Sequence, residues 1–203
     1  MSRRPIPPIA PLVRNILAIY DTASVEFKDA GELWYQVALD ECIQLSREYS
    51  LSTTQAVGIV AALSPNLRWE RNIRAARAVL NGEGSEAYPA NEFKARRIIG
   101  GESPELVLGG LKVNSFYRNI LSGGYDNSVT VDGHAFNAAH DLRQPVKAAR
   151  ISPRDYQRLT IAYRTAARLR SVTPPAMQAA VWIEWRDGLE SRYHPRHWQL
   201  VAA

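Results

Sequence analysis

Residues 108–120 read LGGLKVNSFYRNI, and this stretch decides how the rest of the chain is interpreted. The residues just before it, Ser103-Pro104-Glu105, supply the N-cap, first-turn proline and acidic first turn that open a short helix. Gly109-Gly110 then breaks the chain, and apolar residues at helical spacing predict a second helix from Lys112 to Leu121. The sequence therefore predicts a helix, a tight glycine turn and another helix in direct succession.

A second informative stretch follows at residues 128–139, which read SVTVDGHAFNAA. Its first four residues are β-like, but a run of this length is too short to found a sheet. Asp132 comes next, where its carboxylate is well placed to cap the helix that continues to Leu142. Asp132 lies 20 residues after Lys112.

Helical spacing of apolar residues dominates the rest of the chain. Further helices are predicted from Leu12 to Tyr20, from a capping box at Asp29 and Glu32 to Tyr49, from Ser52 to Pro65, from Trp69 to Leu80, from Glu92 to Ile99, from Pro153 to Leu169 and from Pro174 to Trp185. We therefore expect an all-α protein with about nine helices.

The composition is that of a globular protein, since 46% of the 203 residues are apolar and 22% are charged. The 25 Lys and Arg residues exceed the 20 Asp and Glu residues, which gives a net charge of +5. Almost all of the positive charge is arginine, whose planar guanidinium pairs with phosphate in a bidentate manner. This balance favours a phosphate-bearing partner.

Several classes of protein are excluded by simpler features. The single cysteine, Cys42, rules out an internal disulfide, a four-cysteine iron–sulfur cluster and a cysteine-rich zinc site. Four prolines interrupt the apolar part of the N-terminus, residues 1–13, and no later apolar run is long enough to span a bilayer. We expect a cytoplasmic protein, associated with the nucleoid, without a membrane segment, a metal or a cofactor.

Four stretches, taken in chain order, resemble the helix-hairpin-helix DNA glycosylase superfamily, to which endonuclease III belongs. They are GIVAALSPNLRWERNIRAA at residues 58–76, FKARRII at 93–99, the hairpin at 108–120 and the segment at 128–139. The last stretch is similar to the VDTH-x-x-R segment of the family. The resemblance covers most of the chain, and its order and spacing carry more weight than any single motif.

The resemblance implies a two-lobed, all-α fold of the helix-hairpin-helix glycosylase type. Residues 51–127 would form the lobe that contains the hairpin, and residues 1–50 with 128–203 would form the other, with the active site in the cleft between them. Members that also cut the DNA backbone place a lysine and an aspartate at the positions of Lys112 and Asp132. These two residues are therefore the expected catalytic pair.

The sequence also departs from the family pattern. The usual hairpin is L-P-G-V-G-x-K, whereas here Leu108 is followed by two glycines and Leu111, without the proline and one residue shorter. The usual threonine after the aspartate is Gly133, and the usual arginine is Asn137. The lone cysteine indicates a divergent member without an iron–sulfur cluster.

The chemistry of these two residues follows from their side chains. Cleaving a base from deoxyribose develops positive charge on the sugar, which the carboxylate of Asp132 would stabilise. A desolvated lysine amine, here that of Lys112, can attack the same sugar carbon and form a Schiff base. The enzyme would then also nick the backbone.

Further residues are candidates for binding DNA. A base inside a duplex is reached only after it is flipped out, so the expected partner is duplex DNA with a flipped base, bound by a monomer. The residues expected to hold the strand are Gly109, Gly110, Arg96, Arg97, Arg118 and His134. The residues expected to contact the extruded base are Asn66, Trp69 and Tyr117.

Plainer interpretations stand beside these assignments. Asp132 taken alone is an ordinary helix cap, Lys112 a solvated first-turn lysine and His134 a packed histidine.

The resemblance and the candidate residues together give the hypothesis of a DNA glycosylase with AP-lyase activity that excises a damaged or modified base. One alternative is a base-modifying enzyme of the same fold that acts on hypermodified pyrimidines, and another is a catalytically inactive helix-hairpin-helix DNA-binding protein.

Overall fold

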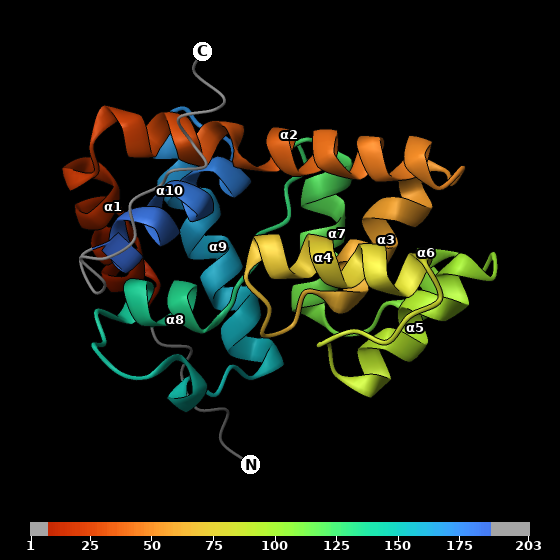
Figure 1. Ribbon diagram of the computed structural model, residues 1–203. Helices are drawn as coiled ribbons and strands as arrows, with labels where there is room; N and C mark the ends of the chain where they lie inside the picture. Colours follow the sequence, from red (N-terminus) through yellow and green to blue (C-terminus); the bar gives the residue numbers. More distant parts are fainter. Residues whose placement is uncertain (1–7, 188–203) are drawn as a thin grey trace. The chain divides into compact units, whose positions relative to one another are not determined.

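The computed structural model describes residues 8–187, and every regular element in this range is helical (Figure 1). The described residues contain ten α-helices and one 3-10 helix and no strand, which confirms the all-α prediction. The elements are α1 (Ala10–Thr22), α2 (Val25–Glu48), α3 (Thr53–Leu63), α4 (Trp69–Leu80), α5 (Pro89–Ile99), α6 (Pro104–Val107), α7 (Leu111–Leu121), α8 (Gly133–His140), η1 (Val146–Ala148), α9 (Pro153–Leu169) and α10 (Pro174–Asp187).

The helices form two compact units. The first unit contains the described residues up to Leu33 and those from Val131 onward, so two separate parts of the chain build it. Within it α1 contacts α8, α9 and α10, and α10 also contacts α8 and α9. Its core includes the fully buried side chains of Ile16, Leu159, Tyr163 and Met177.

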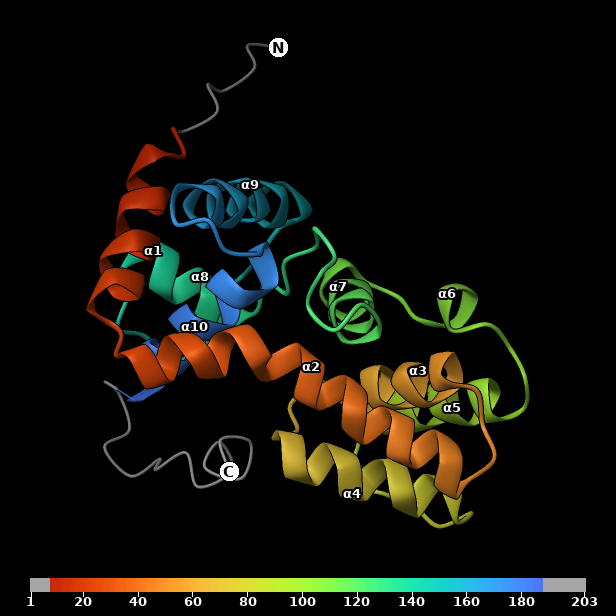
Figure 2. The same cartoon turned by 90° about the horizontal axis from the view of Figure 1, so that it is seen from above.

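The second unit spans Trp34–Thr130 and is organised around α3. Residues 56–63 of α3 are all buried, because the helix contacts α4, α5, α6 and α7. Figure 2 shows α3 and α5 lying together within this unit. A helix that is apolar on every side is expected at the centre of a helical core.

The boundary between the units falls inside α2, at Trp34, rather than at the end of that helix near residue 51. The Trp34 ring belongs to the second unit because it packs against the rings of Trp69 and Phe116, with centroids 5.3 and 5.9 Å away. The downstream boundary follows Thr130 instead of residue 127. A boundary within a continuous helix leaves no proline, glycine or polar linker for the sequence to reveal.

The helix starts show which local signals operate. Helix α3 starts where predicted, and Ser52 and Gln55 form a capping box there with both reciprocal hydrogen bonds. The box predicted at Asp29 is wrong, because α2 begins at Val25 and Asp29 lies within the helix. Ser24 provides the cap instead, since its Oγ accepts a hydrogen bond from the Phe27 N–H at 3.2 Å.

Gly31 tests the packing of the first unit. A Cβ on this residue of α2 would lie 2.5 Å from the backbone nitrogen of Ala180 in α10. We expect Gly31→Ala to lower the free energy of unfolding by about 1–3 kcal/mol, as overpacking does, although alanine is the better helix former. Urea denaturation measures the change. Gly84→Ala is the matched control, because nothing lies within 4 Å of a Cβ there, and equal stabilities of the two variants would contradict the close approach.

Candidate functional site

The hairpin consists of α6, a turn at residues 108–110 and α7. Gly110 precedes α7 with a φ of +80°, a conformation that L side chains rarely adopt. The side-chain amide of Asn114 donates to the Gly110 carbonyl oxygen at 3.0 Å and closes the turn. Gly110 carries no side chain that could cap α7, and the positive end of the α7 helix dipole lies at this turn. The turn is thus suited to an anionic group.

A partly buried hydrogen bond joins the two helices of the hairpin. The Tyr117 hydroxyl on α7 donates to Oε1 of Glu105 on α6 at 2.6 Å, and the Ser103 hydroxyl donates to the other Glu105 oxygen. Hydrogen bonds from Ser103 and Tyr117 lower the pKa of Glu105, and the nearby Arg118 contributes in the same direction. Burial raises the pKa of Tyr117, which is 3% exposed. Tyr117 therefore braces the hairpin and presents little surface for stacking on a base.

The hairpin is seated on α3 through Gly58. A Cβ on Gly58 would lie 2.6 Å from Cγ of Pro104, the first residue of α6. Glycine at this position lets α6 approach α3 closely, and the proline presets the backbone at the helix start. The central helix of the unit thereby fixes where the hairpin begins.

Two amines lie at the start of the hairpin's second helix. Lys112 is the second residue of α7 and is half-buried. Lys94, on α5, places its Nζ 3.7 Å from the position of a Cβ on Gly109. Neither amine forms an ion pair with any residue in the range 8–187. The sequence did not single out Lys94, because its approach to the turn depends on how α5 packs.

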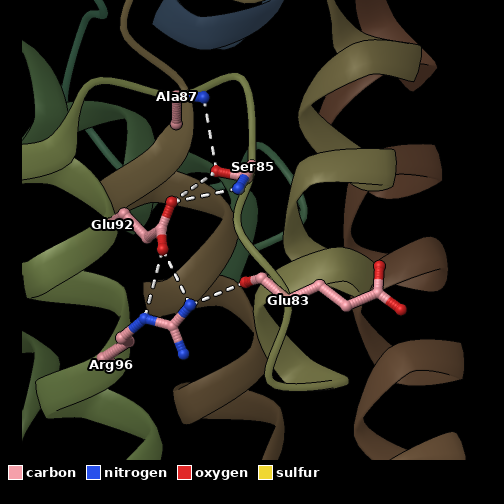
Figure 3. A network of polar contacts seen from close by, with 5 residues as sticks. All are labelled: Glu83, Ser85, Ala87, Glu92 and Arg96. Carbon is pink, nitrogen blue, oxygen red and sulfur yellow. Dashed lines mark hydrogen bonds and ion pairs between the residues drawn. The ribbon is translucent and has the colours of Figure 1, made fainter.

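Arg96 belongs to a polar network between α5 and the loop before it (Figure 3). Its guanidinium donates to Oε1 of Glu92 at 3.2 and 2.7 Å and to the carbonyl oxygen of Glu83 at 2.6 Å. The other Glu92 oxygen accepts from the backbone N–H and the hydroxyl of Ser85, both at 3.1 Å. The Ser85 hydroxyl also accepts from the Ala87 N–H at 3.3 Å. Arg96 thus holds the loop in place.

The other two arginines expected to bind DNA differ from each other. Arg97 donates to both oxygens of Glu102, at 2.7 and 2.5 Å, on the surface. Arg118 is exposed on α7, and it forms no ion pair within residues 8–187. Of the three arginines, Arg118 is the one without an ion pair among these residues.

Asn66 and Trp69, expected in a base pocket, lie at the turn between α3 and α4. Asn66 is exposed with a φ of +65°, and its amide donates to the Tyr88 hydroxyl at 2.8 Å. Trp69 is half-buried, because its ring packs edge-on against Trp34. Asn66 is therefore the more accessible of the two.

Asp132 caps α8 as the sequence predicts. Its Oδ1 accepts a hydrogen bond from the Ala135 N–H at 2.8 Å, and the residue is half-buried. The next residue, Gly133, packs closely on Val146. A Cβ at Gly133 would lie 2.5 Å from Cγ1 and 2.7 Å from the carbonyl oxygen of Val146. This contact leaves no room for a side chain at the residue after Asp132. The backbone after Asp132 is consequently held against η1.

The remaining residues of this segment stabilise α8. Asn137 is 2% exposed and exchanges two hydrogen bonds of 2.9 Å with Gln144, one through the Gln144 carbonyl oxygen and one through its side-chain amide. His134 is half-buried, with its ring 6.2 Å from that of Trp182 in an edge-on arrangement. His134 therefore packs within the first unit.

The candidate residues are divided between the two units. Lys112, the hairpin, the arginines and the expected base contacts belong to the second unit, and Asp132 and His134 belong to the first. Cys42 is fully buried, and burial is the main cause that raises the pKa of its thiol to about 12, so it is no nucleophile.

Among residues 8–187, no three His, Cys, Asp or Glu side chains are grouped to hold a metal. No helix in that range is long and apolar enough to cross a membrane.

A family model matches most of the chain. The model of DUF7178, described as a family of unknown function, matches residues 8–189. No curated protein and no solved structure matches the chain.

The Glu92 network makes stability depend on pH. Hydrogen bonds from Arg96, and then from the Ser85 backbone, lower the pKa of Glu92. Their contribution is full above the ordinary pKa of glutamate, about 4.3, and is lost as the pH falls through the lower folded value. We expect Glu92→Gln to lower the free energy of unfolding by about 1–2 kcal/mol at pH 7, and the difference to shrink as the pH falls below the ordinary pKa of glutamate.

Denaturation across this pH range measures the effect. Glu102→Gln is the control, since its ion pair with Arg97 is exposed and contributes less. A difference that stays constant down to pH 3 would mean that the charge of Glu92 does not stabilise the loop.

Proposed function

The chain belongs to the DUF7178 family, and from its residues we propose that it is a DNA glycosylase of the helix-hairpin-helix type. It removes a damaged or modified base and then opens the strand as an AP lyase. The observation that carries this proposal is the succession of two features along the chain. The N-terminus of α7 follows a glycine turn at Gly110, and the Asp132 carboxylate is held by its cap at the N-terminus of α8. The resemblance in motif order supports the same function.

The hairpin supplies the grip on the strand. A helix N-terminus behind a glycine turn directs backbone N–H groups at a phosphate, and such contacts position DNA without reading its sequence. Lys94, whose Nζ lies near Gly109, and the exposed Arg118 of α7 add positive charge to the hairpin, in place of Arg96 and Arg97, whose guanidinium groups have intramolecular partners. Affinity should then fall steeply with salt, as expected for phosphate contacts.

Asp132 supplies the carboxylate that opposes the charge on the sugar. Breaking the N-glycosidic bond leaves positive charge on the deoxyribose, and a fixed carboxylate stabilises this state electrostatically. Oδ1 is held by the Ala135 N–H, which sets the direction of the group. Oδ2 forms no hydrogen bond within the described residues, so it is the oxygen for the sugar.

Lys112 supplies the amine for the second step. Its Nζ adds to the C1′ aldehyde of the abasic deoxyribose, and loss of water leaves an imine. Removal of a C2′ proton then expels the 3′ phosphate, which breaks the strand by β-elimination. The imine is a Schiff base, so borohydride reduces it to a stable covalent adduct.

The variant Asp132→Asn removes the negative charge of the residue but keeps its ability to cap α8. Asparagine caps a helix about as well as aspartate, so we expect an unchanged melting temperature. Loss of the negative charge should slow base release by about 100-fold or more. The measurement is the free base released from a panel of duplex oligonucleotides, each carrying one modified base.

Asp141→Asn is the matched control for this variant. Asp141 ends the same helix in the left-handed region, with φ of +52°, where asparagine is well tolerated. This variant should release base at the wild-type rate. If Asp132→Asn also does so, or if the wild-type protein releases no base, the glycosylase proposal fails.

Lys112→Arg tests the lyase step. Arginine keeps the positive charge at the hairpin but does not form a Schiff base. We expect the variant to bind and to release base while the borohydride adduct on abasic DNA disappears. Lys147→Arg, an exposed lysine on η1, is the control that keeps the adduct. An adduct that persists in Lys112→Arg would assign the nucleophile to another amine.

A further inference from the structure

Asp132 follows a buried, non-helical connection that has no sheet to bond with. Residues 128–131 lie between α7 and α8, with Val129 and Val131 at most 1% exposed. A buried backbone N–H without a partner is costly, so each one needs an acceptor. The Val131 N–H finds it in the Tyr156 hydroxyl oxygen at 3.2 Å. The peptide just before Asp132 is therefore anchored to a side chain of α9.

A second tyrosine holds the backbone just after Asp132. The Tyr163 hydroxyl donates to the Ala135 carbonyl oxygen at 3.1 Å, and Tyr163 is fully buried. Ala135 is the same residue whose N–H binds the Asp132 carboxylate. Burial, and next the negative charge of Asp132, raise the pKa of Tyr163. The carboxylate of Asp132 therefore lies close enough to the Tyr163 hydroxyl to affect its ionisation.

Both tyrosines come from one face of α9. Tyr156 and Tyr163 are seven residues apart, which is two helical turns and places them in line. Helix α9 is well fixed, because the Ser152 side chain caps it and α1 and α10 pack against it. The two hydroxyls are therefore fixed points, one before Asp132 and one after it.

We propose that Tyr156 and Tyr163 are positioning residues, which hold the Asp132 carboxylate in the direction needed for base release. This inference rests on the function proposed above for Asp132. Neither tyrosine contacts the substrate in this role, and both act through the backbone around the cap. A shift of about 1 Å in a reacting group can cost a factor of about 100 in rate, so such anchors matter even without chemistry of their own. Gly133, packed on Val146, limits movement from the side of η1.

Tyrosine-to-phenylalanine variants test the proposal in the full-length protein. Tyr163→Phe is the first choice, because the Ala135 carbonyl oxygen still accepts its hydrogen bond within α8 when the hydroxyl is lost, so no buried group is left without a partner. Tyr156→Phe removes the acceptor of the Val131 N–H and is the second variant. Tyr125→Phe, on an 82% exposed side chain, is the control.

The kinetic measurement is single-turnover base release on the best oligonucleotide of the panel. We expect a rate at least about tenfold lower in each of the two variants, with the Kd for DNA changed less than about twofold. A residue that acts only in overall stability would not produce this division between rate and binding. Wild-type rates in both variants would overturn the proposal.

Amide hydrogen exchange reports on the cap without any substrate. The Ala135 N–H should exchange at least about tenfold faster in Tyr163→Phe and Tyr156→Phe, relative to the Ile16 amide in the core of the same unit. If the ratio of the two exchange rates is unchanged, the tyrosines do not hold the cap and the inference is wrong.

The two measurements distinguish failure of the inference from failure of the proposed function. A wild-type protein that releases no base from any oligonucleotide overturns the glycosylase proposal, and with it any catalytic role for the tyrosines. Base release that depends on Asp132 but not on either tyrosine leaves the glycosylase in place and overturns the positioning role alone.

Discussion

The connection at residues 128–131 imposes the constraint on which much of the structure depends, because a buried backbone outside a helix or sheet must find its hydrogen bonds elsewhere. In the second unit, the segment is held through a side chain, because the Thr130 hydroxyl oxygen accepts from the Asn119 side-chain amide at 3.1 Å. In the first unit, the Val131 N–H is satisfied by Tyr156. Neighbouring residues of one segment are thus bonded to different helices, α7 and α9. Their side chains, rather than a sheet, determine where Asp132 emerges.

Close backbone approach is the second determinant, and three glycines permit it. Because glycine has no side chain, α10 packs closely on α2 at Gly31, and Pro104 of α6 packs closely on α3 at Gly58. In the same way η1 packs closely on Gly133, next to Asp132. Each site would place a Cβ under 3.0 Å from another atom, and interiors packed as densely as crystals do not absorb such overlaps. The hairpin and the cap therefore owe their placement to packing that the motifs themselves do not contain.

Signals confined to a few consecutive residues predicted local structure well. The capping box at Ser52, the glycine turn ahead of Lys112 and the cap at Asp132 are all present. Asp29 shows where such signals fail. Aspartate often caps a helix, but it is also tolerated inside one, and here Ser24 has already capped α2 before Asp29 is reached. The unit boundary at Trp34 was missed for a related reason, since packing of one ring, rather than a change in composition, transfers the second half of α2 to the other unit.

By itself the sequence determined the all-α class, most helix limits, the hairpin and the position of Asp132 at a helix start, since each depends on interactions among neighbours in the chain. Only the tertiary structure decided which charged and aromatic side chains remain available. It pairs Arg96 with Glu92, buries Tyr117 in the hairpin and brings Lys94 to the turn. The reason is that ion pairing and burial depend on which segments approach one another, and helical periodicity places a residue on a face without specifying what lies opposite.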